Sequence, residues 1–193
     1  MYQVRFHGRG GQGVVTAAEL LSVAAFREGR HSQAFPSFGS ERTGAPVVAF
    51  CRLDDKPIRL REPILSPDAV VIQDPTLLHQ VDVFGGLAPH GFVLINTSRA
   101  VAELGLEDFA ASRTVATVPA TELALTYVGK PLPNAALLGA LAAATRRIAL
   151  DSVCSAIRER FGTRIADANV AAATAAYDFV EARHRENEHA QAG

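Results

Sequence analysis

The sequence predicts an α/β fold with a largely parallel sheet. Short apolar or alternating segments, which are typical of strands, recur up to residue 118 and are separated by turns or helical patterns. After Pro119 the pattern changes, and every further predicted element is a helix. No internal repeat and no long linker interrupts the sequence. We therefore expect a single domain over residues 1–185 and a polar, disordered tail over residues 186–193.

The predicted strands differ in their hydrophobic pattern. Residues 2–7 alternate between polar and apolar and stop at a glycine, as expected for a first strand. Residues 69–73 and 92–96 are continuous apolar runs, which indicate strands that are buried on both faces. The remaining strands are expected at residues 31–35, 46–53 and 114–118, with a short return strand at 58–60.

The predicted helices are bounded by recognisable signals. Apolar side chains recur at helical spacing from Val14 and stop at Glu28-Gly29, a pair that suits a helix C-cap. Asn134 is expected to cap a later helix, with a role facing a partner or a ligand as the alternative. The later helices are expected at residues 121–128, 134–148, 151–161 and 166–185. Together these elements predict a three-layer, largely parallel, Rossmann-like sheet with a helical C-terminal part.

The composition excludes several classes of partner. Hydrophobic residues make up 48% of the 193 residues and charged residues 20%, as in ordinary soluble globular proteins. With 19 basic and 20 acidic residues, the chain has no general positive field to attract nucleic acid or an anionic membrane. The N-terminus lacks the apolar core of a signal peptide, and no run approaches the roughly 20 apolar residues that cross a bilayer. We expect a cytoplasmic protein with no nucleic-acid or membrane partner.

The sequence predicts no catalytic residue and no metal ligand in this chain. Cys51 and Cys154 are far apart and outside any CxxC motif, so we expect two buried thiols. An iron–sulfur cluster normally needs about four thiolates, which this chain does not contain. The six histidines lack the spacing of a metal site. His7 closes the first strand and could approach a ligand, but a structural role is favoured.

A glycine-rich turn links the first predicted strand to the first helix. Residues 8–13, Gly-Arg-Gly-Gly-Gln-Gly, match GxGxxG in the structural context that this motif requires. Glycines permit positive φ angles and close backbone approach, and the start of a helix presents unpaired N–H groups to an anion. Thr16 in the first helical turn can add a hydroxyl. The turn indicates a phosphate-bearing ligand, and the alternative is a tight turn that only packs on the core.

The sequence argues against a dinucleotide as that ligand. An NAD site of the Rossmann type uses an acidic residue about 20 positions on, at the end of the second strand. The second predicted strand ends at Ala34-Phe35-Pro36, and Glu28 lies at the end of the preceding helix. The loop that follows, residues 37–44, carries hydroxyls, glycines and one arginine, which is the chemistry of a phosphate cradle. A different phosphate-bearing ligand is therefore favoured.

Three sequence blocks, in order, carry a resemblance to a known family. They are residues 6–18 (FHGRGGQGVVTAA), residues 35–47 (FPSFGSERTGAPV) running on to 55–58, and residues 119–122 through Asn134 to 138–140. With Pro67-Asp68 and residues 74–78, they extend the similarity from residue 2 to about residue 180. The chain resembles the γ subunits of the 2-oxoacid:ferredoxin (acceptor) oxidoreductases, the pyruvate, 2-oxoisovalerate and phenylglyoxylate group.

The resemblance implies a subunit of a larger enzyme. The complex would convert a 2-oxoacid, CoA and an oxidised acceptor into acyl-CoA, CO2 and the reduced acceptor. Thiamine diphosphate with Mg would lie in α and β partner subunits, [4Fe–4S] clusters in a ferredoxin-like partner, and ferredoxin or NAD would be the final acceptor. The γ subunit would contribute to assembly and to a shared CoA site.

The resemblance also implies which residues take part in the CoA site. Gly10, Gly11 and Gln12 would offer backbone or amide donors to the phosphates, with Gly8 and Gly13 shaping the turn. Ser40, Arg42 and Thr43 of the second loop would close over the same nucleotide, with Arg42 as its main positive charge. Many relatives have Arg or Lys at the position of Thr43, so one charge is missing here. The expected site residues are Gly8, Gly10, Gly11, Gln12, Gly13, Ser40, Arg42 and Thr43.

Two alternatives remain open at the level of sequence. The first is a free-standing NAD(P)-dependent reductase, against which the missing carboxylate at the second strand argues. The second is an assembly module whose glycine turn packs against a partner and never touches a ligand.

Overall fold

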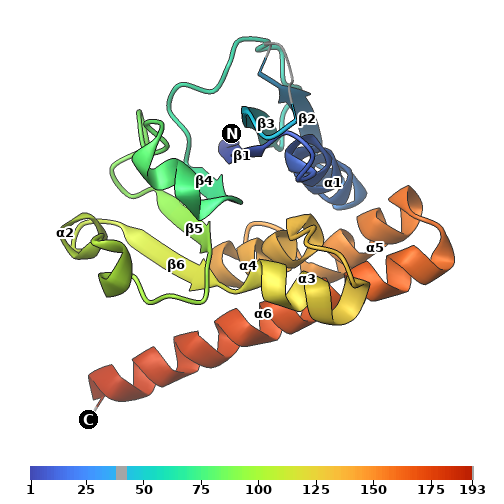
Figure 1. Ribbon diagram of the computed structural model, residues 1–193. Coiled ribbons are helices and arrows are strands. Elements are labelled where there is room, and N and C mark those ends of the chain that lie inside the picture. Colours follow the sequence, from blue (N-terminus) through green and yellow to red (C-terminus); the bar gives the residue numbers. More distant parts are fainter. Residues whose placement is uncertain (38–42, 193) are drawn as a thin grey trace.

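The computed structural model describes residues 1–37 and 43–192 and contains a six-stranded sheet of order β2-β3-β1-β4-β5-β6 (Figure 1). The pairs β1–β4, β4–β5 and β5–β6 are parallel, whereas β3 runs antiparallel to both β1 and β2. All strands except β3 therefore run in the same direction. The strands are β1 (Tyr2–Arg9), β2 (His31–Pro36), β3 (Pro46–Asp54), β4 (Ala69–Ile72), β5 (Phe92–Asn96) and β6 (Thr114–Val118).

The helices divide unequally between the two faces of the sheet. The long helices pack on one face, and α6 passes beneath α3 and α4 (Figure 1). Short elements cover the β4–β6 part of the other face. The long helices are α1 (Val14–Arg27), α3 (Ala120–Val128), α4 (Asn134–Thr145), α5 (Leu150–Arg160) and α6 (Thr163–Ala192), and the short ones are η1 (Pro75–His79), η2 (Ala102–Leu104) and α2 (Glu107–Ala110). The predicted α/β architecture with a helical C-terminal part is confirmed.

The continuous apolar runs of β4 and β5 are buried on both faces, as the sequence predicted. In β4, Ala69 and Val71 contribute to the large core under the long helices, while Val70 and Ile72 belong to the smaller core on the opposite face. Alternate residues of a strand point to opposite faces, so a strand with a core on each side needs apolar residues throughout.

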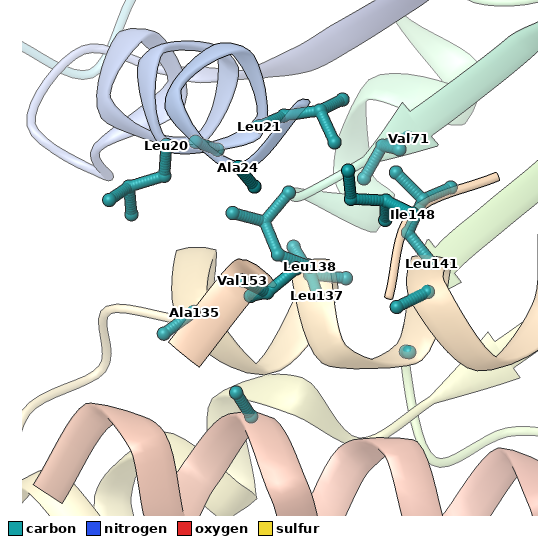
Figure 2. Packing of buried hydrophobic residues seen from close by; sticks show 14 of the residues in the cluster. Leu20, Leu21, Ala24, Val71, Ala135, Leu137, Leu138, Leu141, Ile148 and Val153 are labelled. Carbon is teal, nitrogen blue, oxygen red and sulfur yellow. The ribbon is translucent and has the colours of Figure 1, made fainter. Parts of the chain in front are cut away.

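Helix α4 forms the centre of the helical layer. Every residue from Asn134 to Ala143 is buried, which explains why this helix is apolar on all sides. Its leucines pack against Leu20 and Leu21 of α1 and against Val71 of β4 (Figure 2). On its other side it packs closely on α6, where small residues such as Ala173 and Ala176 are fully buried.

The predicted return strand at residues 58–60 is wrong. These residues form no strand, and the chain that follows contacts the side chain of Arg52 of β3 instead. The reason is the fully buried Arg52, whose guanidinium donates to the Glu62 carbonyl at 2.6 Å and to the side-chain oxygens of Gln3 and Gln33. Ile64, which is buried, anchors the segment. A buried guanidinium needs acceptors, and this segment provides one.

One helix cap and two helix ends also differ from the prediction. Asn134 is the first residue of α4 and does not cap it, because Pro133 holds the cap position. Helix α4 ends at Thr145, three residues early, because Arg146 adopts a left-handed conformation with φ of 53°. Its guanidinium binds the Tyr177 hydroxyl and the Glu181 carboxylate of α6. Helix α6 continues to Ala192, beyond the predicted end near Arg185. Within the described ranges, no helix combines the length and apolarity needed to cross a membrane.

Substituting Gly139 by alanine tests the close contact between α4 and α6. A Cβ atom on Gly139 would stand 1.9 Å from the carbonyl oxygen of Ala173, so the two helices would have to separate. We expect Gly139→Ala to lower the free energy of unfolding by about 1–3 kcal/mol, although alanine favours helices. Denaturant unfolding measures this change. Gly162→Ala, whose Cβ would meet open space, is the control, and equal stability of the two variants would contradict the prediction.

Candidate functional site

The glycine turn lies at the carboxyl edge of the parallel strands. Strand β1 ends at Arg9, and the turn leads into α1, which begins at Val14. Along the chain, β1 is followed by β2 and β3 on one side of it and by β4 on the other. In open α/β sheets, ligands bind outside the carboxyl ends of the strands at the point where the strand order reverses. The turn occupies that position.

Backbone conformation explains the glycines of the turn. Gly11 and Gly13 have φ angles of 92° and 77°, which residues with a Cβ rarely adopt. A Cβ on Gly13 would stand 2.9 Å from Asn134 Nδ2, and one on Gly8 would stand 2.5 Å from Val14 Cγ2. A Cβ on Gly11 would meet nothing within 4 Å, because this residue faces open space. Gly8 and Gly13 permit close packing, and Gly11 leaves room beside the backbone.

Some N–H groups of the turn are engaged and others are not. The Gly10 N–H donates to the Ala45 carbonyl at 2.9 Å, and the Gln12 N–H donates to the Arg9 carbonyl at 3.1 Å. The N–H groups of Gly11 and Gly13 have no acceptor among the residues that the structure describes. Helix α1 begins without a side-chain cap. The first helical N–H groups therefore remain available to an anion.

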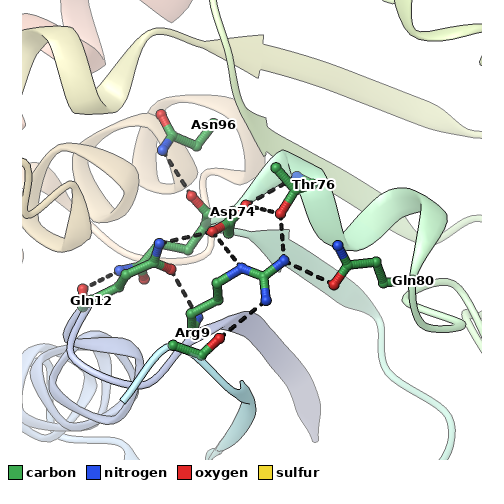
Figure 3. A network of polar contacts seen from close by, with 8 residues as sticks. Arg9, Gln12, Asp74, Thr76, Gln80 and Asn96 are labelled. Carbon is green, nitrogen blue, oxygen red and sulfur yellow. Dashed lines mark hydrogen bonds and ion pairs between the residues drawn. The ribbon is translucent and has the colours of Figure 1, made fainter.

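The Arg9 guanidinium holds the turn against its neighbours (Figure 3). Its Nε donates to Asp74 Oδ2 at 3.0 Å, and Nη1 donates to the Gly44 carbonyl at 3.1 Å. Nη2 donates to Thr76 Oγ1 at 2.6 Å and to Gln80 Oε1 at 2.8 Å. One side chain thus connects the glycine turn, the residues before β3, and η1.

Gln12 has a structural function inside the turn. Its Oε1 accepts from the Arg9 N–H at 2.8 Å, and its Nε2 donates to Asp74 Oδ2 at 2.8 Å (Figure 3). The Gln12 carbonyl accepts a hydrogen bond from Gln73 Nε2. Both the backbone and the side chain of Gln12 are therefore engaged, as is the Gly10 N–H, although the sequence suggested these groups as donors to a ligand. The N–H groups of Gly11 and Gly13 are the ones in the turn without an acceptor among the described residues.

Asp74 is the acceptor on which Arg9 and Gln12 converge. Burial would raise the pKa of this carboxyl, but hydrogen bonds from Thr76 and Gln12 and the charge of Arg9 outweigh burial and lower the pKa below its ordinary value. Asp74 directly follows the β4 region at the carboxyl edge, next to Gln73. At the same edge, Asn96 of β5 donates to the Gln73 carbonyl at 2.8 Å and to Thr121 Oγ1 at 2.7 Å.

A cavity of about 660 Å³ opens on the helical side of the turn. Its walls come from the turn, from the end of α3 and the following loop, and from the start of α6. Two of its lining residues, Lys130 and Arg164, are positively charged. The lining residues are Gly11, Gly13, Thr16, Tyr127, Val128, Lys130, Leu132, Asn134, Phe161, Arg164, Ile165, Ala168 and Asn169.

The second predicted loop reaches the turn at its C-terminal end. Thr43 pairs with Gly10 in an isolated parallel bridge, and the Gly44 N–H donates to the Gly10 carbonyl at 3.1 Å. Ser40 and Arg42 lie outside the described residues. The sequence reasoning did not identify Arg9, Lys130 or Arg164. Arg9 occupies a variable position of the GxGxxG motif. Lys130 and Arg164 lie far from the turn in the sequence and come close to it only in the folded chain.

His7 has the structural role that the sequence favoured. Its Nε2 accepts a hydrogen bond from Arg5 Nε at 2.9 Å, on the face of the sheet opposite the long helices. Arg5 in turn donates to the carbonyls of Val83 and Gly85. Burial, followed by the charge of Arg5, lowers the pKa of His7 to about 4, so the imidazole is neutral.

The two cysteines and the other possible metal ligands complete the candidate groups. Cys51 and Cys154 are both buried free thiols, as predicted, and burial raises the pKa of each. Across residues 1–37 and 43–192, no three His, Cys, Asp or Glu side chains are grouped to hold a metal ion.

Comparison with known proteins relates the whole chain to one family. Residues 3–179 match the family described as pyruvate ferredoxin/flavodoxin oxidoreductase. The chain is 48% identical to the pyruvate/ketoisovalerate oxidoreductases common subunit gamma of Pyrococcus furiosus, over 94% of this chain and 98% of that protein. It is 33% identical to the crystal structure of pyruvate oxidoreductase subunit PORC from Thermotoga maritima, with a TM-score of 0.78 over 92% of this chain and 95% of that one. At 15% identity it shares the fold of 2-oxoglutarate:ferredoxin oxidoreductase from Magnetococcus marinus, with a TM-score of 0.75 over 94% of this chain and 31% of that one.

The chain belongs to the pyruvate ferredoxin/flavodoxin oxidoreductase family. Within this family it is a γ-type subunit of a 2-oxoacid oxidoreductase complex, because the similarity extends over nearly the full length of γ subunits. The resemblance carried by the three sequence blocks is thereby confirmed.

Removing the Arg9 side chain tests its role in holding the turn. Arg9→Met leaves the Asp74 carboxylate without its cation, and we expect the free energy of unfolding to fall by about 1–3 kcal/mol. The double variant with Asp74→Asn should lose less than the sum of the two single variants, because the two side chains act as a unit. Denaturant unfolding of all three variants measures this coupling.

The control for Arg9→Met is Arg27→Met. Arg27 forms an exposed ion pair with Glu159, and such pairs contribute at most about 1 kcal/mol. Equal losses for Arg9→Met and Arg27→Met would show that Arg9 does not hold the turn.

The neutral state of His7 predicts a pH dependence of stability. An unfolded histidine takes up a proton near pH 6.5, whereas folded His7 does so near pH 4. The stability that depends on neutral His7 is fully present above pH 6.5 and is lost as the pH falls towards 4. We expect His7→Gln to show a shallower loss of unfolding free energy over this interval. His90→Gln, at an exposed position, is the control, and identical slopes for wild type and His7→Gln would refute the prediction.

Proposed function

We propose that this chain helps to bind CoA in a complex that converts a 2-oxoacid, CoA and an oxidised acceptor into acyl-CoA, CO2 and the reduced acceptor. The observation that carries the proposal is the pair of unengaged N–H groups of Gly11 and Gly13 at the uncapped start of α1. Such a group of donors suits the phosphates of a nucleotide. The membership of the chain in the family supports the overall reaction.

The topology of the sheet favours CoA over a dinucleotide. In an NAD site the strand next to β1 ends beside the glycine turn and carries an acidic residue there. In this sheet the neighbour β3 is antiparallel, so its first residue, Pro46, lies beside Arg9 at that edge. Among the described residues, this edge is reached by Pro46 at the start of β3 and by Pro36 at the end of β2, and neither supplies a carboxylate to a ribose. CoA has a pyrophosphate and a 3′-phosphate and does not require that carboxylate.

Each predicted site residue has a defined part in this proposal. Gly11 and Gly13 donate to phosphate oxygens, while Gly8, Gly10 and Gln12 give the turn its shape. Ser40, Arg42 and Thr43 of the second loop close over the nucleotide, with Arg42 as the cation. When bound, CoA supplies the thiol that takes up the acyl group, and this chain holds and orients its phosphates.

The other components of the reaction are proposed to lie in partner subunits. Thiamine diphosphate with Mg lies in the α and β subunits, and [4Fe–4S] clusters lie in a ferredoxin-like subunit, from which electrons pass to ferredoxin or NAD. The proposed complex is cytoplasmic. This chain then acts by assembly and by forming one wall of the CoA site.

Affinity capture tests the proposed complex directly. We expect a tagged version of the full chain, expressed in its native host, to bring down thiamine-bearing and cluster-bearing subunits that mass spectrometry identifies. The captured material should oxidise a 2-oxoacid only when CoA is added. If instead the chain purifies alone and turns over a substrate without companions, the proposal is wrong.

A further inference from the structure

The two edge strands of the sheet are protected differently. Strand β6 forms one edge, and the Arg183 guanidinium from α6 donates to the Thr117 carbonyl at 3.3 Å and to Thr117 Oγ1 at 3.0 Å. Strand β2 forms the other edge and contains no Lys, Arg, Asp or Glu residue. Folded proteins commonly place charges on an edge strand, which prevents it from pairing with another chain. Strand β2 lacks such a charge, and its proline, Pro36, is its last residue.

The backbone groups of Ser32 and Ala34 point away from the sheet. The Ser37 N–H donates to the Val48 carbonyl at 2.8 Å, which places the hydrogen-bonded pairs between β2 and β3 at every second residue. The odd-numbered residues of β2 therefore bond to β3, whereas Ser32 and Ala34 present their N–H and C=O groups to the outside. These outward groups have no partner among the residues that the structure describes.

Helix α1, which packs against β2, places an exposed apolar side chain beside this edge (Figure 1). Phe26 of α1 is 72% exposed. With Ser22, Ser32 and the ion pair between Arg27 and Glu159, it lines a groove of about 620 Å³. The Ser32 hydroxyl donates to the Ser22 carbonyl at 2.8 Å, which ties this part of α1 to the edge strand. An exposed phenyl ring next to unpaired strand groups is typical of a surface that another chain covers.

The outer edge of β2 is complementary to itself. An antiparallel copy related by a two-fold axis through Gln33 brings Ser32 opposite Ala34 of the second copy, and Ala34 opposite its Ser32. Every outward N–H and C=O group of these two residues then finds a partner, and the two sheets become continuous. A two-fold axis through Ala34 is less favourable, because it places the Ser32 carbonyl opposite Pro36, which has no N–H to donate.

The same axis brings the two α1 helices together, because both lie on one face of the joined sheet. The groove of each copy then faces the groove of the other, and the two Phe26 rings fill the space between the helices. The charges of Arg27 and Glu159 compensate each other within each copy, at a distance of 2.5 Å. The surface therefore presents no excess of one charge that would repel an identical surface.

We propose that two copies of this chain associate through the edges of β2, with antiparallel pairing about Gln33 and with Phe26 of one copy packed against Phe26 of the other. The proposal is independent of the CoA function proposed above. It places two γ-type chains in one particle, joined at the edge of the sheet opposite β6.

Analytical ultracentrifugation of the purified full chain tests the association. We expect wild type to sediment as a dimer that dissociates on dilution, because an interface of one strand and one helix face is small. Phe26→Glu places a carboxylate of each copy against the other and should raise the dissociation constant about tenfold or more. Ala34→Pro removes an outward N–H, spares the bonds to β3 and should act similarly. Leu65→Glu, at a side chain that is 76% exposed outside β2 and α1, is the control and should change nothing.

A disulfide across the two-fold axis tests the register. Residues opposite each other in a non-hydrogen-bonded antiparallel pair have Cα atoms about 4.5 Å apart, which suits a disulfide. We expect Gln33→Cys to form a disulfide-linked dimer on mild oxidation, and Thr114→Cys, at an exposed position of the other edge strand, to form none. Arg52 keeps its acceptors at Gln3 and Glu62 in this variant. Both native cysteines are buried free thiols.

Hydrogen exchange distinguishes a second copy from another occupant of the edge. In the dimer, the N–H groups of Ser32 and Ala34 should exchange more slowly than in Phe26→Glu. A monomeric wild type in which these groups are protected only in the captured complex would assign the edge to a different subunit and overturn the proposal. A monomer without protection in either state, or a dimer that Phe26→Glu leaves intact, would also overturn it. Because Phe26 is largely exposed in the single chain, this variant keeps the test decisive if Ala34→Pro fails to fold.

Discussion

The ion pair between Arg9 and Asp74 is the interaction on which the candidate site depends. Glycines give the turn conformational freedom but no rigidity, so neighbouring groups must impose its shape. Asp74 holds the turn through two hydrogen bonds, because one of its carboxylate oxygens accepts from Arg9 Nε and from Gln12 Nε2. The Gln12 side-chain oxygen in turn accepts a hydrogen bond from the backbone N–H of Arg9, which holds the start of the turn in place. The N–H groups of Gly11 and Gly13 are therefore presented by a turn that is held at both ends.

The reversed direction of β3 has consequences for both edges of the sheet. Its first residue, Pro46, lies beside the glycine turn, and its last residue, Asp54, lies beside the N-terminus. Asp54 binds the N-terminal ammonium at 3.3 Å, at the edge away from the turn. The carboxylate that ends this strand is thus remote from the site where a dinucleotide would need it. At the edge beside the turn, the backbone of residues 43–45 pairs with Gly10.

Much of the fold was predictable because local patterns reflect burial. The continuous apolar runs of β4 and β5 and the helical spacing of α1 identified those elements with boundaries close to the observed ones. The segment at residues 58–60 was mistaken for a strand because its pattern did not reveal that the buried Arg52 needs the Glu62 carbonyl. Of the candidate site, the glycine turn was found from its motif. Lys130 and Asn134 are close in sequence, but Arg164 and the glycine turn are far from them, and nothing in the local sequence indicates that these residues share a cavity.

The sequence by itself determined the order of strands and helices, the position of the glycine turn and membership in the family, since each depends on residue type and spacing along the chain. The tertiary structure alone decided the direction of β3, the engagement of Gln12 and Arg9, and the composition of the cavity. The pairing of β1 with β3, the contacts of Arg9 and Gln12 with Gly44 and Asp74, and the cavity bring together residues more than 30 positions apart. Such contacts depend on how the sheet is ordered and how closely α4 and α6 pack, which no local pattern encodes.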